Sequence, residues 1–368
     1  MISSRPSPLR LVHRPLFDKW FAGVLSACAA GAALSAHAQF DTFGGDPSTN
    51  AFIRIPSDTD DWTRHFRLGA LVGINIKANF SENGTFSPSG NNPAAGIFSD
   101  GYVVKSPNSP YTSNWGFNNS SQLSGDNLYL HGTSAYSTSQ NSSSGNGAFP
   151  GLDMAYGGNL WYWKHARVGW EMGFGWLPIN ISSSSSGPAS VDTFTYKYST
   201  GGIVVPTGPG GGYQGSNLGY GPSIPGNPVS EITSTNNSGT VSGTHTLDVD
   251  LYTLRLGPSI YWDITERTGI SIGAGPAIGL VSGEYKYNET VVSGGVVTQN
   301  SGSVSGTDFV FGGYVNAAFM YHLVNNGDIY IGAQYMPMGD ATISGGGRSG
   351  QLNLNGQTYF SVGINWPF

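Results

Sequence analysis

Hydrophobic and polar residues alternate one by one along several segments of this chain. The segment 356–368 alternates without a break, with Phe360, Val362 and Ile364 on one side and small or polar residues between them. Successive side chains of a β-strand point to opposite faces, so this segment is predicted to be a strand with one apolar and one polar face. It is long enough for a transmembrane β-strand, which needs roughly 9–11 residues.

Seven other segments have the same two-residue period. They are residues 65–80, 152–162, 167–179, 247–262, 269–287, 307–323 and 328–336. In the first of them, only Leu71 interrupts the polar face. In 247–262 the alternation changes phase near Leu251 and Tyr252, which predicts either a β-bulge or the edge of a membrane at that point.

The connections between these segments alternate between long and short. Residues 81–150 and 182–245 are rich in Asn, Ser, Gly and Pro and are predicted to be long loops. Loops of this length are uncommon inside a compact domain, but they are usual on the outer side of a membrane barrel. The pattern therefore predicts an all-β fold: an antiparallel up-and-down transmembrane β-barrel of about eight strands, with long extracellular loops and short periplasmic turns.

The beginning of the chain is predicted to be a secretory signal peptide, residues 1–38. Basic residues precede an apolar run at 20–34, and Ala36-His37-Ala38 gives a small-x-small cleavage pattern. The polar segment 39–63 is then a periplasmic leader, and 64–368 is the barrel.

A second processing route is open at Cys28. Leu25 to Cys28 resembles a lipobox, in which Cys28 would become the lipidated first residue. The apolar run continues past Cys28 to Leu34, which favours cleavage after Ala38 instead. Cys28 is the only cysteine, so disulfides and thiolate metal sites are excluded from a mature chain that begins after Ala38.

Composition narrows the possible partners. The chain has 16 basic and 22 acidic residues, and a formal net charge of −6, so it is expected to repel nucleic acid rather than bind it. Past the predicted signal peptide no run of 18 apolar residues occurs, so no transmembrane helix is expected. A mean hydropathy of −0.16 is compatible with a barrel, because only alternate residues of its strands face lipid.

The end of the chain resembles the C-terminal signature of bacterial outer-membrane β-barrels. In that family an amphipathic last strand that ends in an aromatic residue is recognised by the barrel-assembly machinery. The resemblance implies an assembly signal formed by Phe360, Val362, Ile364, Trp366 and Phe368. With the signal peptide and the strands, it extends to small eight-stranded barrels of the OmpA, OmpX and OmpW type. It implies a location in the bacterial outer membrane, in contact with its lipid.

The strand phase places five charged side chains in the interior of the predicted barrel. They are Arg67, Lys77, Asp153, Glu171 and Arg255. The interior of an eight-stranded barrel is filled by side chains, and unpaired buried charges are costly, so a network of internal salt bridges is predicted. A structural polar plug is favoured over an ion path or gate.

No cofactor, metal or catalytic site is predicted. Five histidines in the predicted barrel are scattered without a nucleophile motif or paired spacing: His65, His131, His165, His245 and His322. Some small barrels that this chain resembles act on lipids through Ser/His pairs, so a lipid-modifying enzyme is a less favoured alternative. A structural or adhesion-like surface role, with an extracellular ligand held by the long loops, is preferred to a passive channel for small or hydrophobic solutes.

Overall fold

The computed structural model describes residues 64–367 apart from 89, 146, 164, 207, 209–210, 216–221 and 324–326, and for Pro367 the backbone alone. These residues belong to one compact unit, 52–368. The predicted signal peptide 1–38, the predicted leader 39–63 and Phe368 lie outside the described residues.

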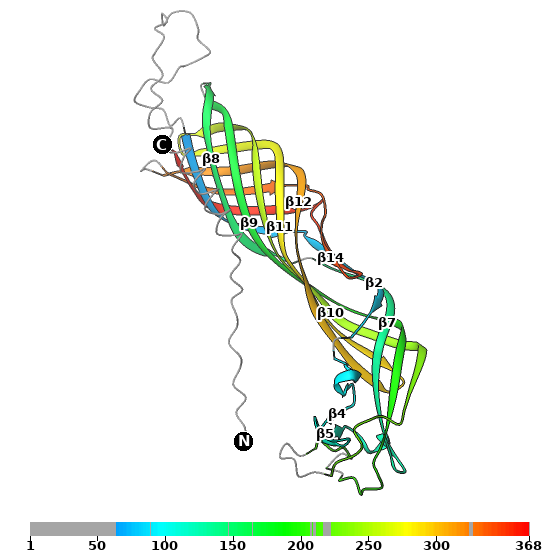
Figure 1. Cartoon of the computed structure of the whole chain (residues 1–368). Coiled ribbons are helices and arrows are strands. Elements are labelled where there is room, and N and C mark those ends of the chain that lie inside the picture. Colours follow the sequence, from blue (N-terminus) through cyan, green and yellow to red (C-terminus); the bar gives the residue numbers. More distant parts are fainter. Residues whose placement is uncertain are drawn as a thin grey trace, which may run out of the picture. The chain divides into compact units, whose positions relative to one another are not determined.

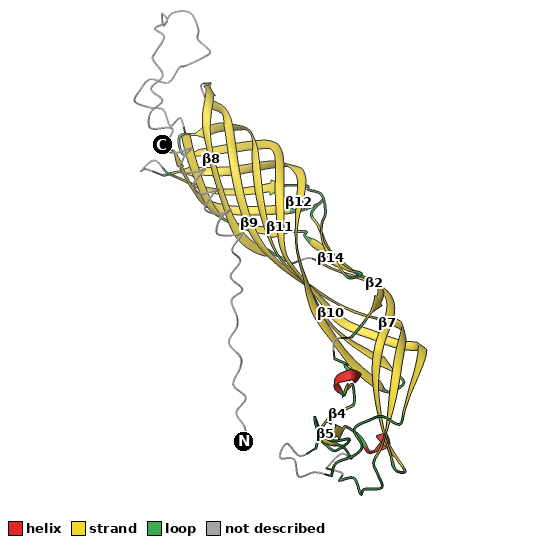
Figure 2. Ribbon diagram, in the orientation of Figure 1, coloured by secondary structure: helices red, strands yellow, loops and turns green. Residues whose placement is uncertain are grey.

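Strands predominate in this part of the chain (Figure 2). They are β1 (Arg64–Ile74), β2 (Lys77–Phe86), β3 (Ile97–Phe98), β4 (Gly101–Lys105), β5 (Thr112–Phe117), β6 (Leu123–Ser124), β7 (Asn127–Gly145), β8 (Phe149–Tyr162), β9 (Ala166–Ser199), β10 (Ser230–Thr265), β11 (Thr268–Ser293), β12 (Val296–His322), β13 (Asp328–Tyr335), β14 (Ala341–Gly345), β15 (Arg348–Asn353) and β16 (Thr358–Pro367). Two short 3-10 helices are η2 (Pro93–Ala95) and η3 (Ser120–Gln122). No described helix is long and apolar enough to cross a membrane.

Eight of these strands close on themselves. In order of pairing they are β1, β8, β9, β10, β11, β12, β13 and β16, and β16 pairs again with β1. Every pairing is antiparallel, and we call this set the eight-strand ring. The predicted antiparallel all-β barrel is therefore confirmed.

Four of the ring strands continue beyond it and take other neighbours (Figure 1). There β9 pairs with β7, β7 with β2, β2 with β15, and β15 with β14, while β9 to β12 remain paired with one another. We call β2, β7, β14 and β15, together with the continuing parts of β9–β12, the extension. Beyond it, β3, β4 and β5 form a separate small sheet.

Two predictions about these elements were wrong. The described residues contain 16 strands, 13 of them in the main sheet, so about eight was too low for the chain as a whole. The predicted loops 81–150 and 182–245 are largely strand, because β2, β7, β9 and β10 run through them. The extension has polar, small side chains on its outer face, which removes the apolar alternation by which the ring strands were recognised.

Strand length separates the two parts. The strands that belong to the ring alone include β13 with 8 residues, β16 with 10 and β1 with 11. These lengths are close to the roughly 9–11 residues of a membrane-crossing strand, and β8, which also belongs to the ring alone, is somewhat longer with 14. By contrast β9 has 34 residues and β10 has 36. At roughly 3.3 Å per residue, β10 is about 120 Å long, several times the thickness of a bilayer.

The outward face of the ring carries a continuous apolar belt. Its exposed members include Phe66, Leu68, Leu152, Leu254, Leu256, Ile260, Ile272, Ile278, Phe309, Phe311, Val315, Phe319, Ile329, Ile331, Phe360, Val362 and Ile364. Exposed aromatic residues at the end with the short turns are Trp161, Trp163, Trp262, Tyr321 and Trp366. Large apolar side chains in such numbers are stable on the outside of a protein only when lipid covers them.

The belt ends abruptly along the strands. Its last rung across β9–β12 is Trp176, Tyr252, Leu280 and Phe309. Two residues further on, the outward rung is Pro178, Asp250, Ser282 and Thr307, and the next is Asn180, Asp248, Glu284 and Ser305. The outer surface therefore changes from lipid-facing to water-facing between two consecutive rungs.

At the same level along the strands, the inward face changes from polar in the ring to apolar in the extension. On β10, Arg255 and Thr253 face the interior of the ring, whereas Leu251 and Val249 face the interior of the extension. The ladders of β10 with β9 and β11 run through Leu251 and Tyr252 without a register shift. The change of phase predicted there is thus no bulge. The two faces exchange their character where the belt ends.

The first predicted strand, 65–80, is two strands joined at Asn75. Asn75 has a positive φ of 60°, and its side-chain amide donates to the carbonyl of Gly356 at 2.7 Å. The chain leaves the ring here and enters the extension as β2. The inward side chains are odd-numbered before Asn75 and even-numbered after it, so Ile76 and Phe80 are buried.

Candidate functional site

The interior of the eight-strand ring holds two buried ion pairs. Arg67 Nη2 donates to Glu171 Oε1 at 2.5 Å, and Arg255 Nη2 donates to Asp153 Oδ1 at 2.6 Å. Each of the four side chains is at most 5% exposed. Glycine makes room for them, because a Cβ on Gly173 would lie 2.3 Å from Arg255 Nε. Four of the five charges predicted to lie inside are therefore brought together in two pairs.

Lys77 is the exception, and its predicted position was wrong. It lies on β2, beyond the shift of phase at Asn75, and its side chain is exposed on the outer face. The prediction extended the phase of β1 through a residue with positive φ, where the alternation moves by one position.

A recess of about 180 Å³ opens at the end of the ring that has the short turns. His65, Tyr261, His322 and Asp328 are among its lining residues. Tyr261 Oη bonds His65 Nε2 at 2.5 Å, and His322 Nδ1 bonds Asp328 Oδ1 at 2.6 Å. These bonds fix the side chains around the mouth of the ring.

A hydrophobic cluster fills the interior where the ring meets the extension. It includes Leu71, Phe80, Phe149, Leu177, Leu251, Val281, Tyr314, Ile343, Leu352 and Tyr359, which come from strands of both parts. We call this cluster the apolar plug. Because its members come from strands of the ring and of the extension, the apolar plug packs the two parts against each other.

A second set of buried charges lies in the extension, beyond the apolar plug. Arg348 of β15 makes a bidentate contact with Glu289 of β11, at 3.1 Å and 2.7 Å. Its Nη2 also donates to Glu82 Oε1 of β2 at 2.9 Å and to Tyr136 Oη of β7 at 2.7 Å. His245 completes the set, and we call these five residues the Arg348 cluster.

Aromatic rings hold the guanidinium from two sides. Its Cζ lies 3.8 Å from the centre of the Phe86 ring and 4.0 Å from that of Tyr287. Such cation–π contacts stabilise a desolvated cation by about 2 kcal/mol. Arg348 is thus fixed by rings as well as by hydrogen bonds.

The Arg348 cluster lies outside the belt, so water rather than lipid surrounds this part of the barrel. Burial raises the pKa of Glu82 from 4.5 to about 7, with the nearby Glu289 carboxylate adding to the rise and Arg348 opposing it. Burial also lowers the pKa of His245 from its usual value. At neutral pH, His245 is therefore uncharged and Glu82 is partly protonated.

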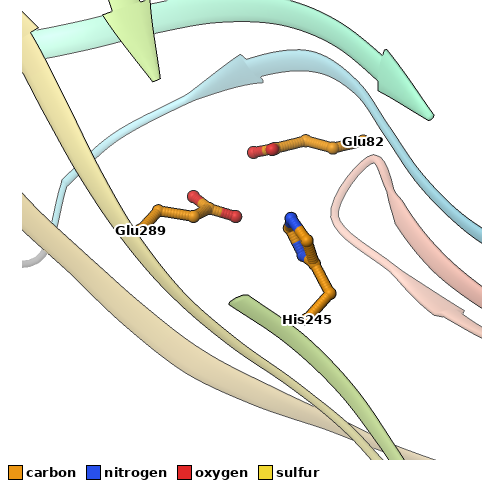
Figure 3. A group of neighbouring side chains, drawn as sticks. All are labelled: Glu82, His245 and Glu289. Carbon is orange, nitrogen blue, oxygen red and sulfur yellow. The ribbon is translucent and has the colours of Figure 1, made fainter. Parts of the chain in front are cut away.

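Glu82, His245 and Glu289 point toward a common centre (Figure 3), and their ligand atoms lie within 4.8 Å of one another. This geometry invites a comparison with a metal site. However, Arg348 lies within hydrogen-bonding distance of both carboxylates and already supplies the positive charge that a cation would bring. The residue set therefore does not fit a divalent metal while Arg348 is in place.

Two of the five histidines, His65 and His322, line the recess, and the other three lie apart from it and from one another. His245 Nδ1 bonds Tyr285 Oη at 2.7 Å, and its Nε2 bonds Ser185 Oγ at 3.0 Å. This Ser/His pair escaped the sequence analysis, but the space beside it leaves no room for a water molecule. His131 bonds Asp100 at 2.6 Å, and His165 is exposed in a short turn.

Sequence reasoning missed the Arg348 cluster for one reason. Glu82 and Tyr136 lie in the predicted loop 81–150, and Arg348 lies between the predicted strands 328–336 and 356–368. A usable signal exists on β11, where Val281, Tyr285 and Glu289 occupy alternate inward positions. A charged residue in phase with buried apolar ones indicates a buried ionic partner elsewhere.

The predicted assembly signal lies on the lipid side of the ring. Phe360, Val362, Ile364 and Trp366 alternate outward on β16 and are each about half exposed. Phe368, its predicted end, lies outside the described residues. Recognition of this strand by the assembly machinery stays a prediction.

A scan of protein-family models finds no match to the chain, and neither does a sequence search of curated proteins. Among solved structures, it is similar to the outer-membrane protease OmpT of Escherichia coli, with 9% identity and a TM-score of 0.31 over 83% of this chain and 96% of that one. It is also similar to OprG, an outer-membrane protein of Pseudomonas aeruginosa, with 9% identity and a TM-score of 0.28 over 82% of this chain and 96% of that one. For Ail, the attachment invasion locus protein of Yersinia pestis, the identity is 8% and the TM-score 0.21, over 82% of this chain and 99% of that one.

The features that define the molecule are the closed antiparallel ring, its apolar belt and its paired interior charges. The finer resemblance to OmpA, OmpX and OmpW is not confirmed, because β9–β12 continue into the extension. Closure satisfies every strand edge within lipid, and the belt supplies the surface that lipid requires. The closed ring and its lipid-facing belt make this chain a transmembrane β-barrel.

Proposed function

We propose that this protein is a closed, non-conducting and non-enzymatic barrel that carries a folded extension at the cell surface. The observation that carries this proposal is the apolar plug, which fills the interior between the ring and the extension. The ring then serves as the membrane anchor, and the extension is the part that meets the surroundings.

Interior contacts support the absence of a channel. A solute entering the recess at the short-turn end meets the two ion pairs and then the apolar plug. An aqueous pore requires a polar, water-filled lumen along its full length. A passive channel for small solutes is therefore the less favoured function.

The build of the extension supports a surface role. It has an apolar interior and a Ser- and Thr-rich outer face, as a soluble β-barrel has. At its far end, Trp115, Phe117, Leu128 and Phe194 form a separate hydrophobic cluster with the small sheet β3–β5. Such a structure positions residues well away from the lipid surface, which suits contact with an extracellular ligand or a neighbouring surface.

Purified protein reconstituted in planar bilayers is expected to show no steady conductance. The reason is that the ion pairs and the apolar plug occupy the lumen in series. A porin incorporated under the same conditions provides the positive control. Sizeable, steady conductance that scales with the amount of inserted protein would contradict the proposal and favour the channel.

The extension is expected to be reachable from outside intact cells. Ser301 is exposed on the outer face of β12 in the extension, whereas Glu266 is exposed in the short turn between β10 and β11. A membrane-impermeant thiol reagent should label Ser301→Cys on intact cells. It should label Glu266→Cys only after the outer membrane is permeabilised. The reverse pattern would place the extension in the periplasm and refute a surface role.

A further inference from the structure

The extension has a seam that no β-ladder closes. In the described residues β14 is the last strand on one side of the sheet, and the part of β12 beside it pairs only with β11. Contacts across this seam include the backbone N–H of Thr342, which donates to Asp308 Oδ2 at 2.9 Å. The apolar side chains of Ile343 and Val304 also pack there. Such a seam is easier to open than a ladder of backbone hydrogen bonds.

The Arg348 cluster joins the two sides of this seam from within. Arg348 and Glu82 lie on β15 and β2, which belong to the extension alone. Glu289 lies on β11, which continues from the ring. The contacts of Arg348 with both carboxylates therefore tie the added strands to the continuing ones across the interior.

The charges of this tie do not balance unless a proton is added. Two carboxylates face a single guanidinium, which is always protonated, and all three side chains are at most 6% exposed. Glu82 Oε2 is buried without a hydrogen-bond partner. A net buried charge of this kind is costly, and a proton shared by the carboxylates removes it.

We infer that the Arg348 cluster binds one proton between Glu82 and Glu289, and that its release loosens β2 and β15 from the continuing strands β11 and β12 across the seam. The extension is then a structure whose seam opens more readily as the surroundings become alkaline. The inference concerns the folded state of the extension and does not depend on whether the barrel conducts.

None of the other groups that face the carboxylates supplies a second positive charge. Tyr136 of β7 and Tyr285 of β11 stay neutral, because burial raises the pKa of each phenol. Tyr287 of β11 contributes the face of its ring, and Asn300 of β12 donates to Tyr136 Oη at 2.7 Å. His245 of β10 is neutral at pH 7, because burial lowers its pKa.

The direction of the pH effect follows from the pKa of Glu82. It is 4.5 in an unfolded chain and about 7 in the folded extension. Below pH 4.5 both states hold the proton, so the stabilisation is complete, and it is lost as the pH rises from 4.5 to about 7. His245 acts in the opposite sense, because its lowered pKa costs stability below pH 6.5.

Hydrogen exchange of the full-length protein in lipid nanodiscs separates the pH effect of Glu82 from that of His245. Glu82→Gln mimics protonated Glu82, because its side chain has the same size, carries no charge and can both donate and accept a hydrogen bond, and the change leaves His245 in place. The opening equilibrium of β2 and β15 in the wild type, divided by that in Glu82→Gln, is expected to rise by up to about tenfold per pH unit between pH 5 and 7. Glu284→Gln, at an exposed pair with Lys286, is the matched control and should give a constant ratio.

A constant ratio for Glu82→Gln over this range would overturn the inference. A second measurement uses the wild type alone and does not need the variant to fold. With glutamate carboxyl groups labelled with 13C, one resonance in the wild-type spectrum is expected to titrate near pH 7. If every glutamate titrates at an ordinary pKa, the cluster does not hold the proton.

Discussion

Replacing Arg348 with methionine is expected to destabilise the extension by about 3–5 kcal/mol, because it leaves two buried carboxylates without their only cation. The change also removes the hydrogen bond to Tyr136 and the packing between Phe86 and Tyr287. Hydrogen exchange should show β2 and β15 opening hundreds to thousands of times more often, while β13 in the ring stays protected.

Two variants calibrate this result. Arg167→Met breaks a pair with Asp263 at 2.8 Å in which both side chains are more than a quarter exposed, so it is expected to cost about 0–1 kcal/mol. Arg348→Lys keeps the charge but cannot make the bidentate contact, so its loss of stability should lie between those of Arg348→Met and Arg167→Met. If Arg348→Met behaves like Arg167→Met, the cluster does not hold the extension together.

Replacing Arg255 with methionine is expected to destabilise the eight-strand ring by about 3–5 kcal/mol. The variant leaves the Asp153 carboxylate buried without its partner, at a site where the arginine is 2% exposed and the aspartate 5%. Unfolding of the protein by urea in lipid vesicles, followed by tryptophan fluorescence, measures the change in the free energy of unfolding.

The double variant Arg255→Met, Asp153→Leu separates the cost of an unpaired charge from the loss of a favourable pair. Replacing both members of a buried ion pair by apolar residues is often neutral. We therefore expect the double variant to recover most of the stability that Arg255→Met loses. A double variant that is as unstable as the single one would show that the geometry of the pair, rather than the stranded carboxylate, determines the stability of the ring.

The ring was predictable from the sequence because lipid imposes a strong pattern on it. On β16, Phe360, Val362 and Ile364 face lipid, and small or polar residues fill the narrow interior between them. The same phase placed Arg67, Asp153, Glu171 and Arg255 inside the ring. Their division into two separate pairs was not predictable, because pairing depends on how strands far apart in sequence are staggered.

The extension was hidden because water covers its outer face. On β9 the residues after Ile181 are small on both sides, Ser182 to Ser186, so no alternation is visible there. On β10 the alternation is visible, with Leu247, Val249 and Leu251 buried, but its phase is opposite to that of the belt. If every apolar face is assumed to meet lipid, a strand whose apolar residues move from one face to the other appears to be interrupted at that point.

The exchange of faces at Tyr252 also fixes how deeply the protein is inserted. A displacement of one rung along the barrel axis corresponds to at most about 7 Å. Sinking by that amount would bring Asp250 and its neighbours on β11 and β12 into hydrocarbon, and rising would leave Tyr252 and Phe309 in water. A bilayer that is thicker or thinner than the belt must therefore change its thickness locally around this protein.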